Sequence, residues 1–66
     1  MNAVAIGKRL IHLRGAKTRQ EVAAAIKISA SALAMYELGN RIPRDEVKVA
    51  LARYYNVSIQ SLFFDS

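Results

Sequence analysis

The side chains of this chain that could do chemistry are mostly cationic. Lysine and arginine together number 10 against 5 aspartates and glutamates, which gives a net charge of +5. Seven of those cations and only two of the carboxylates fall in residues 1–41, so that segment has a net charge of +5, whereas residues 42–66 are neutral. A basic segment favours an anionic polymer, such as a nucleic acid, as its partner. The alternative is that the charge serves solubility alone.

Groups that support catalysis or hold a metal are scarce in the sequence. His12 is the only histidine and cysteine is absent, so the ligand set of a metal site is missing. The sequence also shows no nucleophile–base pair and no glycine-rich phosphate loop. We therefore expect no enzyme activity, no cofactor, no metal site and no small-molecule ligand, and we place His12 on the rim of a helix.

Length and composition predict one small folded domain over residues 1–66. Of these 66 residues 53% are hydrophobic, and only one is proline and three are glycine, a composition too apolar for a disordered chain. The longest apolar run is far shorter than a membrane span, and no signal-peptide pattern opens the sequence. We therefore expect no membrane role and a cytoplasmic location.

The spacing of apolar residues predicts helices throughout, because no segment alternates with the period of a strand. In the first helix Ile6, Leu10 and Leu13 form one apolar stripe, and Gly15 suits its C-terminal cap. The fold class that follows is all-α, a compact five-helix bundle. The expected helices span residues 3–14, 19–26, 30–38, 45–55 and 59–63.

The second and third of these helices are close enough in sequence to form a helix-turn-helix. Thr18 and Glu21 have the spacing of a capping box, Lys27 falls in the short turn, and Ser29 suits the cap of the third helix. Two short capped helices joined by a tight turn are typical of double-stranded DNA binding. The apolar residues of the second helix that we expect to face the core are Val22, Ala25 and Ile26.

The third helix is predicted to present one face to DNA. On a helical wheel Leu33 lies on the inward side, and an outward face enters the major groove in this motif. The residues of the outward face are Ala30, Ser31, Ala34 and Met35. Only Ser31 among them can hydrogen-bond to a base edge. Three interpretations remain: the face packs on thymine methyl groups, specificity comes from Arg19, Arg41 and DNA deformability, or the face binds a protein.

Groups suited to the DNA backbone flank this outward face. The free amides and positive dipole end at the start of the second helix favour a phosphate. Contacts of this kind position a protein on DNA but convey no sequence information. The residues predicted to contact phosphate or to flank the face are Lys17, Thr18, Arg19, Ser29, Asn40 and Arg41.

The residues named above, taken in their order along the sequence, resemble the Cro/C1-type (Xre) helix-turn-helix family of bacterial and phage regulators. The resemblance covers nearly the whole chain. The resemblance implies a lambda-repressor-like bundle, an ion pair between Arg14 and Glu37, and homodimers that bind palindromic operators. The sequence departs from the family at Arg19, where glutamine is frequent, and at Lys27, where the turn glycine is usual. The other matching positions include Ile6, Gly7, Leu10, Leu13, Thr18, Glu21, Val22, Ala23, Ile28, Ser29, Leu33, Tyr36, Gly39, Arg41, Pro43, Ala52, Tyr55, Asn56, Val57, Ser58 and Leu62.

The end of the chain suggests how a homodimer would form. Leu62 can fill the core, which leaves at least one of Phe63 and Phe64 for another surface, and an exposed apolar pair marks an interface. We expect a two-fold dimer built by the last two helices, with Tyr54, Phe63 and Phe64 as candidate interface residues.

Two function classes remain at this point. The first is a sequence-specific DNA-binding transcriptional regulator, a repressor that binds a near-palindromic operator as a homodimer. The second is a protein-interaction module with the same fold, such as an antitoxin or co-regulator, that has weak or no base readout. The apolar outward face of the third helix is the feature that favours the second class.

Overall fold

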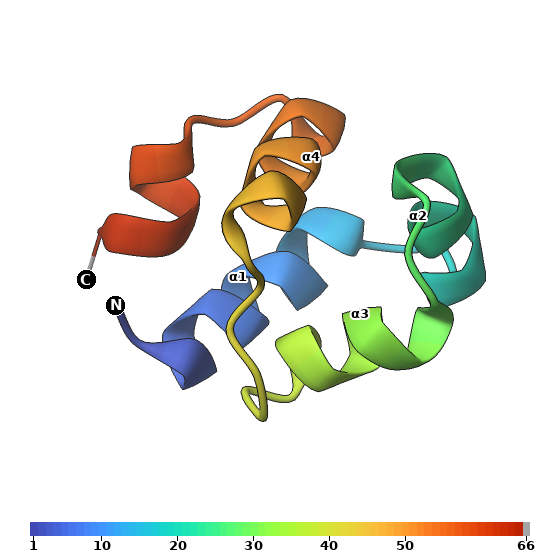
Figure 1. The fold of residues 1–66 in the computed structure, drawn as a ribbon, viewed down its shortest axis with the longest axis horizontal. Coiled ribbons are helices and arrows are strands. Elements are labelled where there is room, and N and C mark those ends of the chain that lie inside the picture. The colour runs from blue at the N-terminus through green and yellow to red at the C-terminus, as the bar shows by residue number, and fades with distance from the viewer. Residues whose placement is uncertain (66) are drawn as a thin grey trace.

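The computed structural model describes residues 1–65, which are organised as five helical segments without strands (Figure 1). The segments are α1 (Ala3–Arg14), α2 (Arg19–Ile26), α3 (Ala30–Glu37), α4 (Asp45–Tyr55) and η1 (Gln60–Phe64). The prediction of an all-α five-helix fold is confirmed. None of the helices within residues 1–65 has the length and apolar character that crossing a membrane requires.

Two segments differ slightly from their predicted form. α3 ends at Glu37, one residue earlier than expected, and Leu38 is its C-terminal cap. η1 begins at Gln60 and is a π-helical turn, because the amide of Asp65 donates to the carbonyl of Gln60, five residues back, at 2.9 Å.

Side-chain caps fix where α1, α2 and α3 begin, and Ser58 makes the same kind of bond two residues before η1. The side-chain oxygens of Asn2, Thr18, Ser29 and Ser58 each accept a hydrogen bond from the amide three residues later, at 3.0–3.1 Å. Each bond satisfies an amide that the first turn of a helix leaves free, which contributes about 1 kcal/mol. The helix starts are therefore encoded locally in the sequence.

The turn between α2 and α3 is made by Lys27, whose backbone is left-handed with φ 61° and ψ 43°. Its amide donates to the carbonyl of Ala24 at 3.3 Å, and the amide of Ile28 donates to the carbonyl of Ala23 at 3.0 Å. These two bonds close the end of α2 and turn the chain directly into the Ser29 cap of α3. A lysine thus holds a conformation that glycine adopts without strain.

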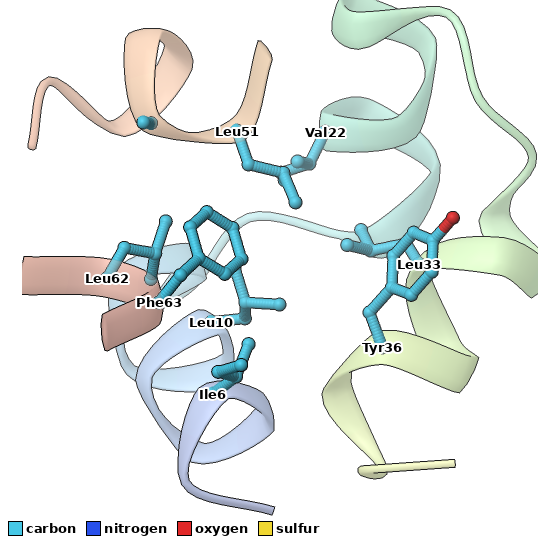
Figure 2. Packing of buried hydrophobic residues seen from close by; sticks show 9 residues of the cluster. Ile6, Leu10, Val22, Leu33, Tyr36, Leu51, Leu62 and Phe63 are labelled. Carbon is cyan, nitrogen blue, oxygen red and sulfur yellow. The ribbon is translucent and has the colours of Figure 1, made fainter. Parts of the chain in front are cut away.

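One apolar core holds the segments together, and every segment supplies at least one side chain to it (Figure 2). Burying an aliphatic or aromatic side chain of this kind contributes about 1.5–3 kcal/mol. The core therefore fixes α2 and α3 relative to α1 and α4. Its most deeply buried hydrophobic side chains, apart from Pro43, are Ile6, Leu10, Val22, Leu33, Leu51, Leu62 and Phe63.

Two expectations about which side chains face the core are wrong. Phe63, predicted for the dimer interface, is only 1% exposed and lies in the core beside Leu62 (Figure 2). The η1 turn directs both of these adjacent residues inward and leaves Phe64 on the surface, 50% exposed. On α2, Ala25 is exposed, and Ala23 is buried in its place.

Candidate nucleic-acid interface

The outward face of α3 is accessible in the structure. Ser31 is exposed, and Ala30, Ala34 and Met35 are each partly exposed. The opposite side of the same helix is anchored by Leu33, which is fully buried in the core. The helix is therefore fixed in the rotation that presents these four residues to a partner.

A hollow of about 530 Å³ lies between this face and the first turn of α2. It brings together residues from the end of α1, the start of α2 and the outward face of α3. Its lining residues are Arg14, Arg19, Gln20, Ala30, Ser31 and Ala34. The hollow joins cations, amide and hydroxyl groups and small apolar side chains in one concave surface.

Gln20 is a member of this surface that the sequence analysis missed. It is exposed and is the second residue of α2, directly after Arg19. A side-chain amide both donates and accepts hydrogen bonds, which suits a phosphate or a base edge. Its place in the first turn of the second helix is the signal that would have identified it.

A buried carboxylate holds the two arginines of the hollow. The side chain of Glu37 is 0% exposed, and it lies 2.7 Å from the Nε atoms of both Arg14 and Arg19. Arg14 donates a second bond, from Nη2 to Oε1 of Glu37, at 3.2 Å. The pair of Arg14 and Glu37 is the one that the family resemblance implied. The pair of Arg19 and Glu37 was not predicted.

Arg14 also ties the segment before α2 to this cluster. Its Nη1 donates to the carbonyl of Lys17 at 2.7 Å. The hydrogen bond to Glu37 raises the pKa of Arg14 above its usual value, although burial acts in the opposite direction. Because two arginines share one carboxylate, the cluster keeps a net positive charge beside the hollow.

The first turn of α2 offers backbone donors next to Arg19. The Thr18 hydroxyl accepts from the Glu21 amide, while the amides of Arg19 and Gln20 have no hydrogen-bond partner within residues 1–65. Free amides at the positive end of a helix dipole are suited to a phosphate. The Thr18 hydroxyl itself serves as the cap of α2, so the free donors at this position are the backbone amides of Arg19 and Gln20.

The remaining flanking residues are distributed around the face. Lys17 is directed toward α4, with its Nζ 3.1 Å from the Tyr54 hydroxyl and 4.8 Å from the centre of the Tyr54 ring. Ser29 serves as the cap of α3. Asn40 and Arg41 are exposed and follow α3 at the end away from its cap. The arginines of this surface therefore gather toward the Glu37 end of α3, where Arg14 and Arg19 bond to Glu37 and Arg41 follows the helix.

A helix-turn-helix family model matches residues 13–62 of the chain, which include α2, α3, α4 and both members of the Arg14–Glu37 pair. The chain belongs to the Cro/C1-type (Xre) helix-turn-helix family. Membership of this family places the helix-turn-helix protein among DNA-binding transcription regulators, with double-stranded DNA as the partner. The comparisons found no curated protein and no solved structure that matches the chain.

Proposed function

We propose that this helix-turn-helix protein is a transcriptional repressor that binds a near-palindromic operator as a homodimer, with α3 of each protomer in a major groove. The observation that supports the proposal is the hollow in which Arg14, Arg19 and Gln20 flank the outward face of α3. It combines groups for the DNA backbone and groups for base edges on one surface, which is the arrangement that groove binding requires.

Backbone contacts in this proposal come from the first turn of α2 and from the loop that follows α3. The free amides of Arg19 and Gln20 meet a phosphate on one side of the groove, and Asn40 and Arg41 meet the backbone on the other side. Each neutralised phosphate releases counterions, so binding weakens steeply as salt is added.

Base contacts from α3 itself are mainly apolar. Ala30, Ala34 and Met35 offer methyl and thioether surface, which packs against the C5-methyl group of thymine. Ser31 is the only residue of the outward face with a hydrogen-bonding side chain. The proposal therefore predicts a preference for A·T base pairs under α3.

The homodimer in this proposal uses the end of the chain. Phe64 is 50% exposed and Ile59 is 37% exposed, and both belong to the segment around η1. Covering this apolar surface with a second copy would favour association, and it extends the small core of a 66-residue chain. Two α3 helices about 34 Å apart would then reach successive major grooves.

Repression follows from occupancy of a promoter, because a bound dimer excludes RNA polymerase from the same DNA. A regulator acts in the compartment that holds its target DNA, so we propose that the protein is located in the cytoplasm of a bacterial cell. Its gene would lie on the chromosome or in a phage genome. The lysine and arginine side chains accelerate association with DNA by steering it electrostatically.

The proposal is tested by selecting bound duplexes from a random pool and then measuring affinity by fluorescence anisotropy at several salt concentrations. We expect a near-palindromic site with half-sites one helical turn apart. Arg41→Gln should weaken binding to all sequences and reduce the salt slope by about 1. Arg53→Gln, an exposed arginine of α4, should change neither. Absence of binding to any duplex at low salt would overturn the proposal.

One observation favours the second candidate, a protein-interaction module. The apolar character of the α3 face continues into Leu38, 60% exposed, and Ile42, 41% exposed. A surface of this kind also suits a protein partner. The same titration separates the two candidates, since the module would bind neither the selected nor an A·T-rich duplex.

A further inference from the structure

We infer that Arg19 contacts a guanine beside α3 in the major groove and that Glu37 is the positioning residue that holds its guanidinium in place. The inference rests on the proposed function, because it assigns a specificity-determining contact within that same DNA interface. It gives the protein a directional base contact that the outward face of α3 lacks.

Glu37 is a rigid anchor for this purpose. Its side chain is completely buried, and Arg14 holds it with two hydrogen bonds, of 2.7 and 3.2 Å. The carboxylate therefore keeps one orientation whether or not Arg19 is present. Arg19 bonds to it through Nε alone, at 2.7 Å.

The two terminal amino groups of the Arg19 guanidinium, Nη1 and Nη2, form a fork of hydrogen-bond donors that stays free. The Arg19 side chain is 37% exposed, and Nη1 and Nη2 have no hydrogen-bond partner within residues 1–65. Because Nε–H donates to Glu37, this bond restricts the orientation of the guanidinium. A preoriented fork loses less conformational entropy on binding than a freely rotating side chain.

The fork lies on the groove side of the protein. Ala30, Ala34 and Glu37 are spaced four and three residues apart along α3, so they share one face of the helix. Arg19, bonded to Glu37, is therefore held at the end of the row that Ala30 and Ala34 form. Arg19 and this row line the same hollow.

The chemistry of the fork favours guanine over the other bases. Guanine presents two acceptors, O6 and N7, to the major groove, and an arginine can donate to both at once. No residue of the outward face of α3 can make such a bidentate contact, since Ser31 has a single hydroxyl. Arg14 continues to satisfy Glu37 throughout, so the buried carboxylate keeps its partner in the complex.

The test uses the duplex selected from the random pool, with 7-deazaguanine replacing one guanine at a time. This base lacks the N7 acceptor but still pairs with cytosine. We expect the wild-type protein to lose between about fivefold and a hundredfold in affinity at one guanine of each half-site. Arg19→Lys keeps the charge but not the fork, so it should bind more weakly and show little further loss on 7-deazaguanine.

Two further proteins test the role of Glu37. Glu37→Gln should behave like Arg19→Lys toward 7-deazaguanine, because it weakens the bond that orients the fork. Arg41→Lys is the matched control, an exposed arginine with no carboxylate partner within residues 1–65, and it should keep the full 7-deazaguanine effect. Should Glu37→Gln fail to fold by circular dichroism, the NMR signal of the Arg19 Nε–H group decides, since this signal should be protected from exchange with and without DNA.

The outcomes distinguish this inference from the proposed function. Absence of binding to any duplex would overturn both. Specific binding without a guanine in the half-site, or a 7-deazaguanine effect that Arg19→Lys retains, would overturn only the inference. A loss of affinity that depends on Arg19 but occurs only with neutral methylphosphonate linkages would make Arg19 a phosphate contact and would also overturn the inference. Loss of Nε–H protection in the complex would overturn it as well.

Discussion

Gly7 of α1 lies against the backbone of Glu37, so that a Cβ atom at position 7 would be 2.3 Å from the Glu37 carbonyl oxygen. The same atom would also be 2.9 Å from the carbonyl oxygen of Tyr36. Because both neighbours are backbone atoms, no side-chain rotation relieves the contact. The absence of a side chain at position 7 therefore allows α1 to reach the end of α3, where Glu37 anchors Arg14 and Arg19.

Gly7→Ala should destabilise the protein by about 1–3 kcal/mol, the usual range for an added methylene in a packed site. This loss should exceed the roughly 0.5–1 kcal/mol that alanine gains over glycine inside a helix. The measurement is urea unfolding followed by circular dichroism. Lys8→Ala, at an exposed position of the same helix, is the control and should change little. A Gly7→Ala protein as stable as wild type would contradict the packing of α1 on α3.

The left-handed backbone conformation of Lys27 predicts a substitution that stabilises the protein. Its φ of 61° costs an ordinary residue about 1 kcal/mol, which glycine does not pay. We expect Lys27→Gly to raise the free energy of unfolding by up to about 1 kcal/mol, and Lys27→Ala to leave it unchanged. Equal unfolding midpoints for the two variants would show that this turn is not strained.

Tyr55 has a buried hydroxyl without a hydrogen-bond partner within residues 1–65. A buried donor that makes no bond costs about 1–3 kcal/mol relative to one that makes it. Tyr55→Phe removes this group and keeps the ring, so the free energy of unfolding at pH 7 should stay equal or rise by about 1 kcal/mol. Tyr54→Phe is the comparison, since it removes a hydroxyl that accepts from Lys17. A clear loss of stability in Tyr55→Phe would reveal a bond that this hydroxyl does make.

Alkaline pH provides a second test of Tyr55. Burial, and then the negative charge of Glu37, raise the pKa of Tyr55 from 10.0 to about 12 in the folded protein. As the pH rises, the phenol of Tyr55 therefore loses its proton at a lower pH in the unfolded chain than in the folded protein. Ionisation of Tyr55 therefore does not affect stability below pH 10, but it lowers the free energy of unfolding as the pH rises toward 12. Between these values wild type and Tyr54→Phe should lose stability more steeply than Tyr55→Phe, as measured by urea unfolding at each pH.

The two adjacent phenylalanines should respond differently to substitution. Phe63 is buried in the core, so Phe63→Ala should cost about 3–5 kcal/mol and leave much of the protein unfolded. Phe64 is half exposed, so Phe64→Ser should leave the fold intact and weaken self-association instead. Sedimentation equilibrium across micromolar concentrations measures the second effect. A Phe64→Ser protein that dimerises as well as wild type would exclude this surface from the interface.

Much of the fold is predictable from the sequence because its signals are local. Thr18 and Ser29 each lie three residues before the amide that they cap, so the starts of α2 and α3 follow from the local sequence. The outward face of α3 follows from the position of Leu33 on the helical wheel, and Leu33 is indeed buried.

The features that were missed depend on contacts between distant segments. Arg19 and Glu37 meet only because the start of α2 packs beside the end of α3, which no local pattern specifies. The choice between Phe63 and Phe64 depends on the π-helical turn of η1, and a run of adjacent apolar residues does not reveal that phase. On the eight-residue α2 the expectation that Ala25 faces the core was wrong, because packing against the other segments buries Ala23 instead.

The central claim is that duplex DNA binds the surface formed by α3 and the first turn of α2. The most direct measurement is an NMR titration of isotope-labelled protein with the selected duplex, in which each backbone amide reports its own environment. The largest shifts should fall on residues 17–20, 29–35 and 40–41, while α4 responds little. Shifts concentrated on η1 and α4, with the α3 amides unchanged, would contradict it.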